Sequence, residues 1–130
     1  MALLAKSGTP GLASPTPSRE NTITGLLAGE ALAAGDVCYI HSNGSVMRSN
    51  GAAANAAAVA VGICPAATPV GEAVTLFINV NFHYGAALTP GTPLYVATTA
   101  GGLDTAATTG GTVAVARVID ASRIRFTGQA

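Results

Sequence analysis

Two cysteines and two histidines are the side chains of this sequence best suited to hold a metal ion: Cys38, His41, Cys64 and His83. Structural zinc sites use two closely spaced pairs of ligands, whereas here only Cys38 and His41 lie close together. The spacing therefore predicts no metal site. It also predicts that the two cysteines are small buried hydrophobic side chains and not part of a disulfide framework.

Nucleophilic or acid–base catalysis has no recognisable motif. No serine lies in a nucleophile elbow, and neither cysteine has an activating context. The acidic residues Glu30, Asp36 and Glu72 stand alone and do not form a carboxylate pair. The Gly pairs at 101–102 and 110–111 lack the Lys-Ser or Lys-Thr that follows a phosphate loop. We expect no enzyme activity, no catalytic residue and no cofactor.

Two other segments carry chemistry worth testing. The segment GEALAAGDVCYI, Gly29 to Ile40, is similar to units of biotinyl and lipoyl carrier domains, but the following hairpin tip is Asn43-Gly44 and the only lysine is Lys6. A carrier needs a lysine at that tip, so this role is excluded. The second segment holds Asn79, His83 and Tyr84, for which two interpretations stay open: a contact with a ligand or partner, or ordinary loop residues.

An internal repeat supplies the elements that would position these residues. The segment Gly29 to Ile40 returns 56 residues later as GAALTPGTPLYV, Gly85 to Val96, with five identical residues. Short runs rich in Val, Ile and Tyr, separated by turn residues, predict strands. The expected strands are Ile23 to Leu27, Asp36 to His41, Val74 to Val80, Thr92 to Ala97 and Ser122 to Thr127; in the last, Ile124 and Phe126 would face inward. Hairpin turns are expected at 42–44 and 100–102, and a loop at 52–58.

These elements predict an all-β fold, a small β-barrel or sandwich built from two similar units at 29–80 and 85–127. Residues 22–130 would form one domain, preceded by an extended arm, residues 1–21, that three prolines keep from folding on itself. Such an arm is either disordered or laid along a neighbouring subunit. Its leucines would be anchors, and the expected contact residues with a partner or subunit are Leu3, Leu4, Lys6, Leu12, Arg19, His83 and Tyr84.

The composition narrows the class of partner. Only 9% of residues are charged and the formal net charge is zero, so we expect much of the surface to be covered by other subunits. The one local basic cluster is Arg117, Arg123 and Arg125, too small for the basic stripe of a nucleic-acid binder. Gly, Pro, Asn and Thr interrupt both long uncharged runs, so no membrane span is expected. The apolar patch Ala2 to Ala5 is too short for a signal-peptide core.

The order of these motifs resembles that of the small cement or decoration proteins of tailed-phage capsids. The segments that carry the resemblance are Gly29 to Ile40, Ala58 to Ile63, Val74 to Val80, Leu88 to Val96 and Val113 to Ile119. The resemblance covers about residues 23–127, and its motifs are structural. It implies a β-rich homotrimer on the outer capsid surface of the virion, made in the host cytoplasm, that ties neighbouring major capsid proteins together.

Two alternatives stay open: a trimeric module of a phage tail, fibre or spike, and a small carbohydrate-binding β domain. A long fibre would show many repeats instead of two. Sugar sites usually use exposed aromatic side chains, and this chain has no Trp and three Tyr. If the cement interpretation holds, removing residues 1–20 should weaken capsid attachment more than it weakens the fold.

Overall fold

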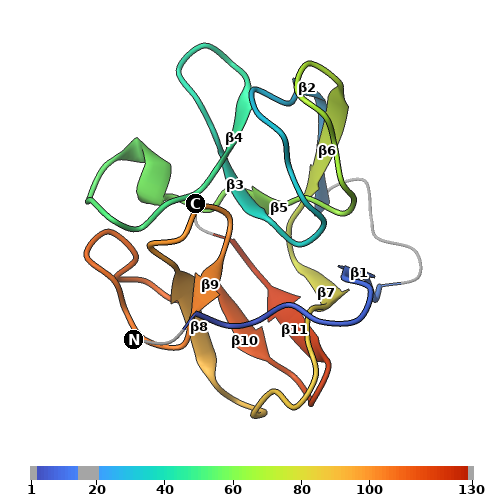
Figure 1. Ribbon diagram of the computed structural model, residues 1–130, viewed down its shortest axis with the longest axis vertical. Coiled ribbons are helices and arrows are strands. Elements are labelled where there is room, and N and C mark those ends of the chain that lie inside the picture. The colour runs from blue at the N-terminus through green and yellow to red at the C-terminus, as the bar shows by residue number, and fades with distance from the viewer. Residues whose placement is uncertain (1–2, 15–20, 129–130) are drawn as a thin grey trace.

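The computed structural model describes residues 3–14 and 21–128 and shows an all-β protein of two open sheets. In Figure 1 the five-stranded sheet fills the upper half and the six-stranded sheet the lower half. The first contains β2 (Thr22–Leu27), β3 (Val37–Ile40), β4 (Val46–Arg48), β5 (Gly62–Ile63) and β6 (Ala73–Phe77). The second contains β1 (Gly11–Leu12), β7 (Val80–His83), β8 (Pro93–Val96), β9 (Leu103–Asp104), β10 (Ala116–Val118) and β11 (Arg123–Phe126). The all-β prediction is confirmed, in the sandwich form and not as a closed barrel.

The internal repeat corresponds to the two sheets. The strand order is β2-β6-β5-β3-β4 in one sheet and β7-β11-β10-β8-β9 in the other, where β1 adds to the outer edge of β7. When the five strands of each set are numbered along the chain, both sets lie in the spatial order 1-5-4-2-3. The two units do not close one barrel together. Each supplies four strands of a sheet of its own, and β2 or β7, which precedes the repeated segment, supplies the first strand.

The two repeated turns also form equivalent hydrogen bonds. The Gly35 amide donates to the Cys64 carbonyl at 2.8 Å, and the equivalent Gly91 amide donates to the Val118 carbonyl at 2.8 Å. Both glycines have φ of 85°, in the left-handed region, where they complete the turns AAGD and TPGT. The identical glycines are thus explained by a backbone conformation that both turns require.

Replacing Gly91 with Ala should lower the free energy of unfolding by about 1–2 kcal/mol, because an L-residue is strained at positive φ. A Cβ at Gly91 would meet no atom within 4 Å, so the loss reports backbone strain alone. Urea denaturation measures it. Gly11→Ala is the matched control, since Gly11 also has open space around it but no positive φ. Equal denaturation midpoints for the two variants would contradict the strain argument.

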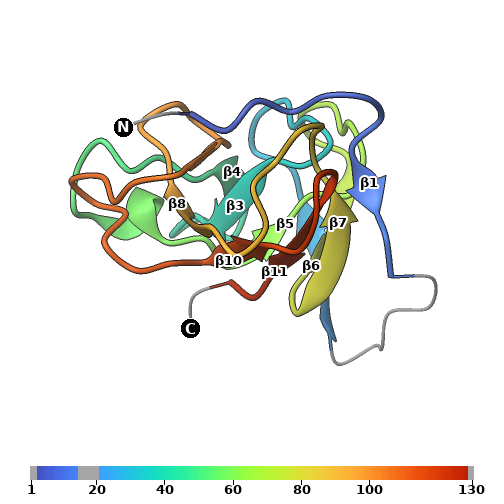
Figure 2. The same cartoon turned by 90° about the horizontal axis from the view of Figure 1, so that it is seen from below.

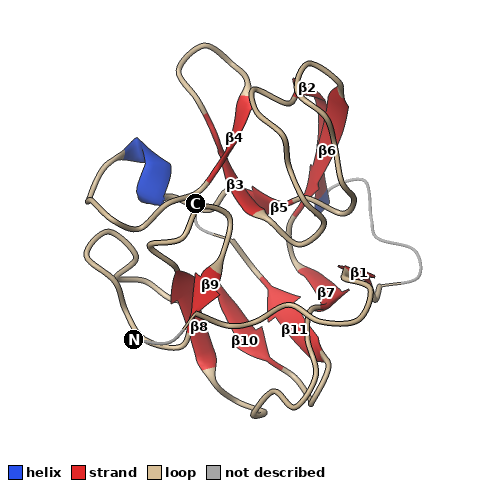
Figure 3. Cartoon of the chain, in the orientation of Figure 1, coloured by secondary structure: helices blue, strands red, loops and turns tan. Residues whose placement is uncertain are grey.

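Both hairpins form where the sequence predicts them. The Ser42–Gly44 turn connects β3 to β4, with the His41 amide donating to the Ser45 carbonyl at 2.8 Å. The turn at residues 100–102 connects β8 to β9. The segment expected to be a loop, residues 52–58, ends in one turn of 3-10 helix, η2 (Ala56–Ala58), which is the blue coil in Figure 3. The side chain of Asn55 caps it by accepting from the Ala57 amide at 3.1 Å.

The prediction of a single strand from Val74 to Val80 is wrong. Strand β6 ends at Phe77 and pairs with β2 and β5, whereas β7 begins at Val80 and pairs with β11 and β1. Between them Asn79 has φ of 52°, a left-handed conformation that Asn tolerates better than most residues. The chain crosses here from one sheet to the other. The segment around His83 is accordingly a strand and not a loop between the two units.

The buried side chains form two clusters. The larger one surrounds Phe82, Tyr84 and Phe126 and includes Val37 and Ile63 from the five-stranded sheet, so it joins the two units. The smaller one lies within the first unit and contains both cysteines. Strand β11 alternates as expected, with Ile124 and Phe126 buried and Arg125 exposed.

Candidate interaction surface

The N-terminal arm, as far as it is described, lies on its own domain. The Leu4 amide donates to the Leu103 carbonyl at 2.7 Å, and Leu3 forms an isolated bridge with Asp104 of β9. Farther along, β1 pairs antiparallel with β7, Gly11 opposite His83. The arm therefore pairs with β9 at one edge of the second sheet and with β7 at the other (Figures 1 and 2). In this structure residues 3–14 follow the surface of their own domain and add a strand to its second sheet.

An ion pair fixes the middle of the arm to the first unit. Lys6 Nζ lies 2.6 Å from Asp36 Oδ1, and the other carboxylate oxygen accepts the Ala33 amide at 2.8 Å. Asp36 is 4% exposed. A carboxylate buried to this degree needs a charge partner or several donors, and the arm supplies the charge. Lys6 is therefore a structural residue of its own chain.

The other expected contact residues are divided between surface and core. Leu3 is 51% exposed and His83 is also exposed, so both are free to touch a partner. The leucines at positions 4 and 12 are half-buried and pack against the larger core cluster. Tyr84 is 0% exposed. It cannot offer a surface to a partner, and its assignment as a contact residue is wrong. Arg19 lies outside the described residues.

The residues considered as metal ligands do not gather in one place. Among the described residues, no three His, Cys, Asp or Glu side chains gather in a group that could hold a metal ion. Both cysteines are buried free thiols, which confirms the prediction that they are small core side chains. Burial raises the pKa of each thiol; for Cys38 the nearby Cys64 adds to this effect. A raised pKa disfavours the thiolate that nucleophilic or redox chemistry needs.

The burial of both thiols predicts that they are labelled slowly in the native protein. We expect a disulfide reagent at pH 8 to react with Cys38 and Cys64 on the order of a hundredfold more slowly in the native protein than in denaturant, because access and thiolate formation are both suppressed. Absorbance of the released thiol measures the rate. Rapid stoichiometric labelling of the folded protein would show that at least one thiol is accessible.

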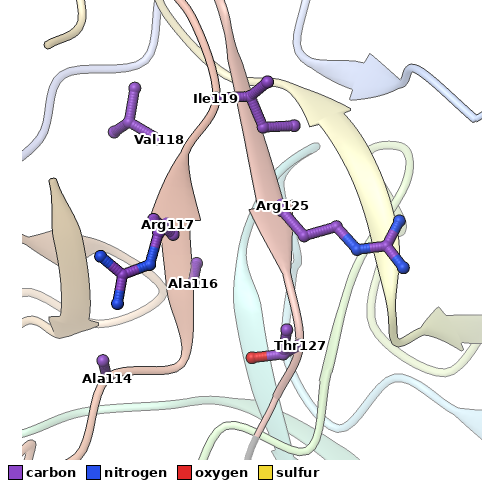
Figure 4. Close-up of a pocket in the computed structure, with 7 residues that line it drawn as sticks. All are labelled: Ala114, Ala116, Arg117, Val118, Ile119, Arg125 and Thr127. Carbon is purple, nitrogen blue, oxygen red and sulfur yellow. The ribbon is translucent and has the colours of Figure 1, made fainter. Parts of the chain in front are cut away.

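A basic groove lies on the outward face of β10 and β11. Arg117 and Arg125 are direct cross-strand neighbours, and both are exposed. The groove beside them has a volume of about 510 Å³. It is lined by the two arginines together with Ile119, Thr127, Ala114 and Ala116. In Figure 4 the two guanidinium groups point away from each other, to opposite sides of the two strands.

These two arginines differ from the other cations of the described chain. Lys6, Arg48 and Arg123 each pair with a carboxylate. Arg117 donates to the Gly91 carbonyl at 2.9 Å and Arg125 to the Asn81 side-chain oxygen at 3.2 Å, both neutral acceptors. The sequence shows the basic cluster; the structure adds that Arg117 lies opposite Arg125 and that Arg123 pairs with Asp120.

The third arginine of that cluster is neutralised locally. Asp120 Oδ2 accepts from Arg123 Nε at 2.8 Å, while Oδ1 accepts the Ser122 and Arg123 amides. The bond from the Ser122 amide, followed by the side chain of Arg123, lowers the pKa of Asp120 to about 2. The carboxylate therefore stays charged at neutral pH and remains beside Arg123.

Two further findings do not concern a particular surface. None of the helical residues within 3–14 and 21–128 forms a helix long and apolar enough to cross a membrane. Comparison with known protein families and with curated proteins found no match to this chain.

Proposed function

We propose that this protein is a structural virion protein that binds the outside of an assembled phage capsid and cements neighbouring major capsid proteins. The duplicated fold is the observation that carries the proposal. The segments that resemble cement proteins, Gly29 to Ile40 and Leu88 to Val96, form equivalent turns and strands in two sheets of the same strand order. The resemblance is therefore supported by a consistent role of its motif residues in the fold, beyond their order along the chain.

Cementing would act by mass action. A protein that binds the assembled shell but not its dissociated subunits stabilises the shell by its binding free energy. A homotrimer would engage several capsid surfaces at once, and the resulting multivalency would raise the overall affinity without stronger individual contacts. Exposed apolar side chains such as Leu3, Leu27, Val70 and Val113, between 51% and 64% exposed, are available for such contacts.

Co-sedimentation tests the proposal. Purified protein is mixed with shells assembled from the major capsid protein of the same phage, and in parallel with that capsid protein before assembly. We expect the protein to pellet with the shells only, and to raise the temperature at which they disrupt. Sedimentation equilibrium of the free protein reports whether it is a trimer. Failure to pellet with any assembled form of the shell would refute the cement role.

A further inference from the structure

We propose that the outward face of β10 and β11 binds an extended acidic segment of a protein partner, with Arg117 and Arg125 each engaging a carboxylate. The inference goes beyond the cement role and does not depend on it, because it follows from the charges and the shape of this face. It assigns to the two arginines a binding site for a segment in which two carboxylates flank a small or apolar residue.

The cross-strand arrangement of the arginines is the first argument. Like charges directly opposite each other in an antiparallel pair destabilise the sheet. Each guanidinium has five N–H donors, and the acceptors found here are one neutral oxygen for each arginine. A carboxylate at each arginine would remove the repulsion and supply the charged acceptor that a guanidinium binds best, often through two parallel hydrogen bonds.

The groove between the arginines is the second argument. Its remaining lining is small or apolar, namely Ala114, Ala116, Val118, Ile119 and Thr127, and Ile119 is 36% exposed. Since the guanidinium groups diverge (Figure 4), one carboxylate cannot easily satisfy both. An extended segment laid across the two strands would place acidic groups at both sides and a small or apolar side chain over the middle.

The same features favour a protein segment over a nucleic acid. Arg117 and Arg125, whose acceptors are both neutral oxygens, form only a short patch. Phosphate backbones are bound by longer series of cations. The groove lining includes no aromatic side chain on which a base could stack.

Peptide titration with the ¹⁵N-labelled full chain tests this inference. The probe is a short blocked peptide of alternating Val and Glu, and the control peptide has Gln in place of Glu. We expect saturable chemical-shift changes at residues of β10 and β11 with the Glu peptide only. The affinity should fall as salt is added, because the contacts are electrostatic.

Matched variants identify the arginines that carry the binding. Arg117→Gln with Arg125→Gln should weaken peptide binding roughly tenfold or more. Asp120→Asn with Arg123→Gln, which removes a neutral ion pair beside the patch, should bind like the parent protein. Circular dichroism shows whether each variant is folded, and Arg117→Lys with Arg125→Lys provides a folded, charge-preserving comparison that should retain part of the affinity. The inference is overturned if the Glu peptide does not bind at low salt, if the double Gln variant binds it equally well, or if an oligothymidylate binds the same face more tightly.

Discussion

Removal of residues 1–14 is expected to lower the free energy of unfolding by about 2–4 kcal/mol. The deletion takes away the packing of the half-buried Leu4 and Leu12 against the larger core and leaves the buried carboxylate of Asp36 without its cation. The expected loss is smaller than the usual cost of breaking a buried ion pair plus the lost burial, because the truncated protein no longer has to order the arm on folding. Urea denaturation of the intact and truncated proteins measures the difference.

The deletion should also change the association behaviour of the protein. Strands β7 and β9 become the edges of the second sheet once the arm is gone, and unpaired edges favour sheet-to-sheet aggregation. Light scattering should therefore rise at high protein concentration for the truncated form. Leu3→Ser is the control, since Leu3 is mostly exposed and its change should alter stability by less than about 0.5 kcal/mol. A truncated protein as stable and as dispersed as the parent would mean that the arm is dispensable for the fold.

This expectation changes the interpretation of any binding experiment with a truncated chain. From the sequence, loss of the arm should affect capsid attachment more than the fold, because the arm has few apolar residues and three prolines. In the structure the arm contributes an ion pair to a residue 30 positions away and a strand to a sheet edge. A loss of capsid binding is therefore informative only if the truncated protein is shown to be folded.

The duplicated sheets could be predicted because their turns require particular residues. Glycine at positions 35 and 91 meets a backbone need that few other residues can meet, so the repeat remains visible in the sequence. The crossing at Asn79 could not be predicted in the same way. Val74, Leu76, Val80 and Phe82 are all buried and keep the period of two across the break, so the pattern is that of one continuous strand.

The candidate interaction surface was only partly visible in the sequence for a related reason. Alternation predicts that Arg125 faces outward from β11, but which residue lies opposite depends on strand register, a tertiary property. The burial of Tyr84 had a visible signal, since it continues the alternation of Val80 and Phe82. Neither interpretation of this segment, as a contact with a partner or as a loop, takes this alternation into account.

Tyr84→Ala should lower the free energy of unfolding by about 3–5 kcal/mol, the usual cost of emptying a buried aromatic site. Tyr84 is fully buried in the cluster that joins the two sheets, so the resulting cavity would loosen both units. Thermal or urea denaturation followed by circular dichroism measures the loss. Tyr84→Phe keeps the ring and removes a buried hydroxyl group that has no hydrogen-bond partner within the described structure. It should leave the free energy of unfolding nearly unchanged or raise it slightly, which separates packing from the hydroxyl group.

His83→Ala is the matched comparison, because His83 is the neighbouring residue and faces outward from β7. Its stability should stay within about 0.5 kcal/mol of the parent protein, so a reduced affinity for capsid shells in this variant would report a surface contact. Tyr84→Ala should reduce shell binding only in proportion to the fraction that is unfolded. If Tyr84→Ala remains as stable as the parent yet no longer binds shells, Tyr84 acts at the surface and the arrangement of this strand has to be revised.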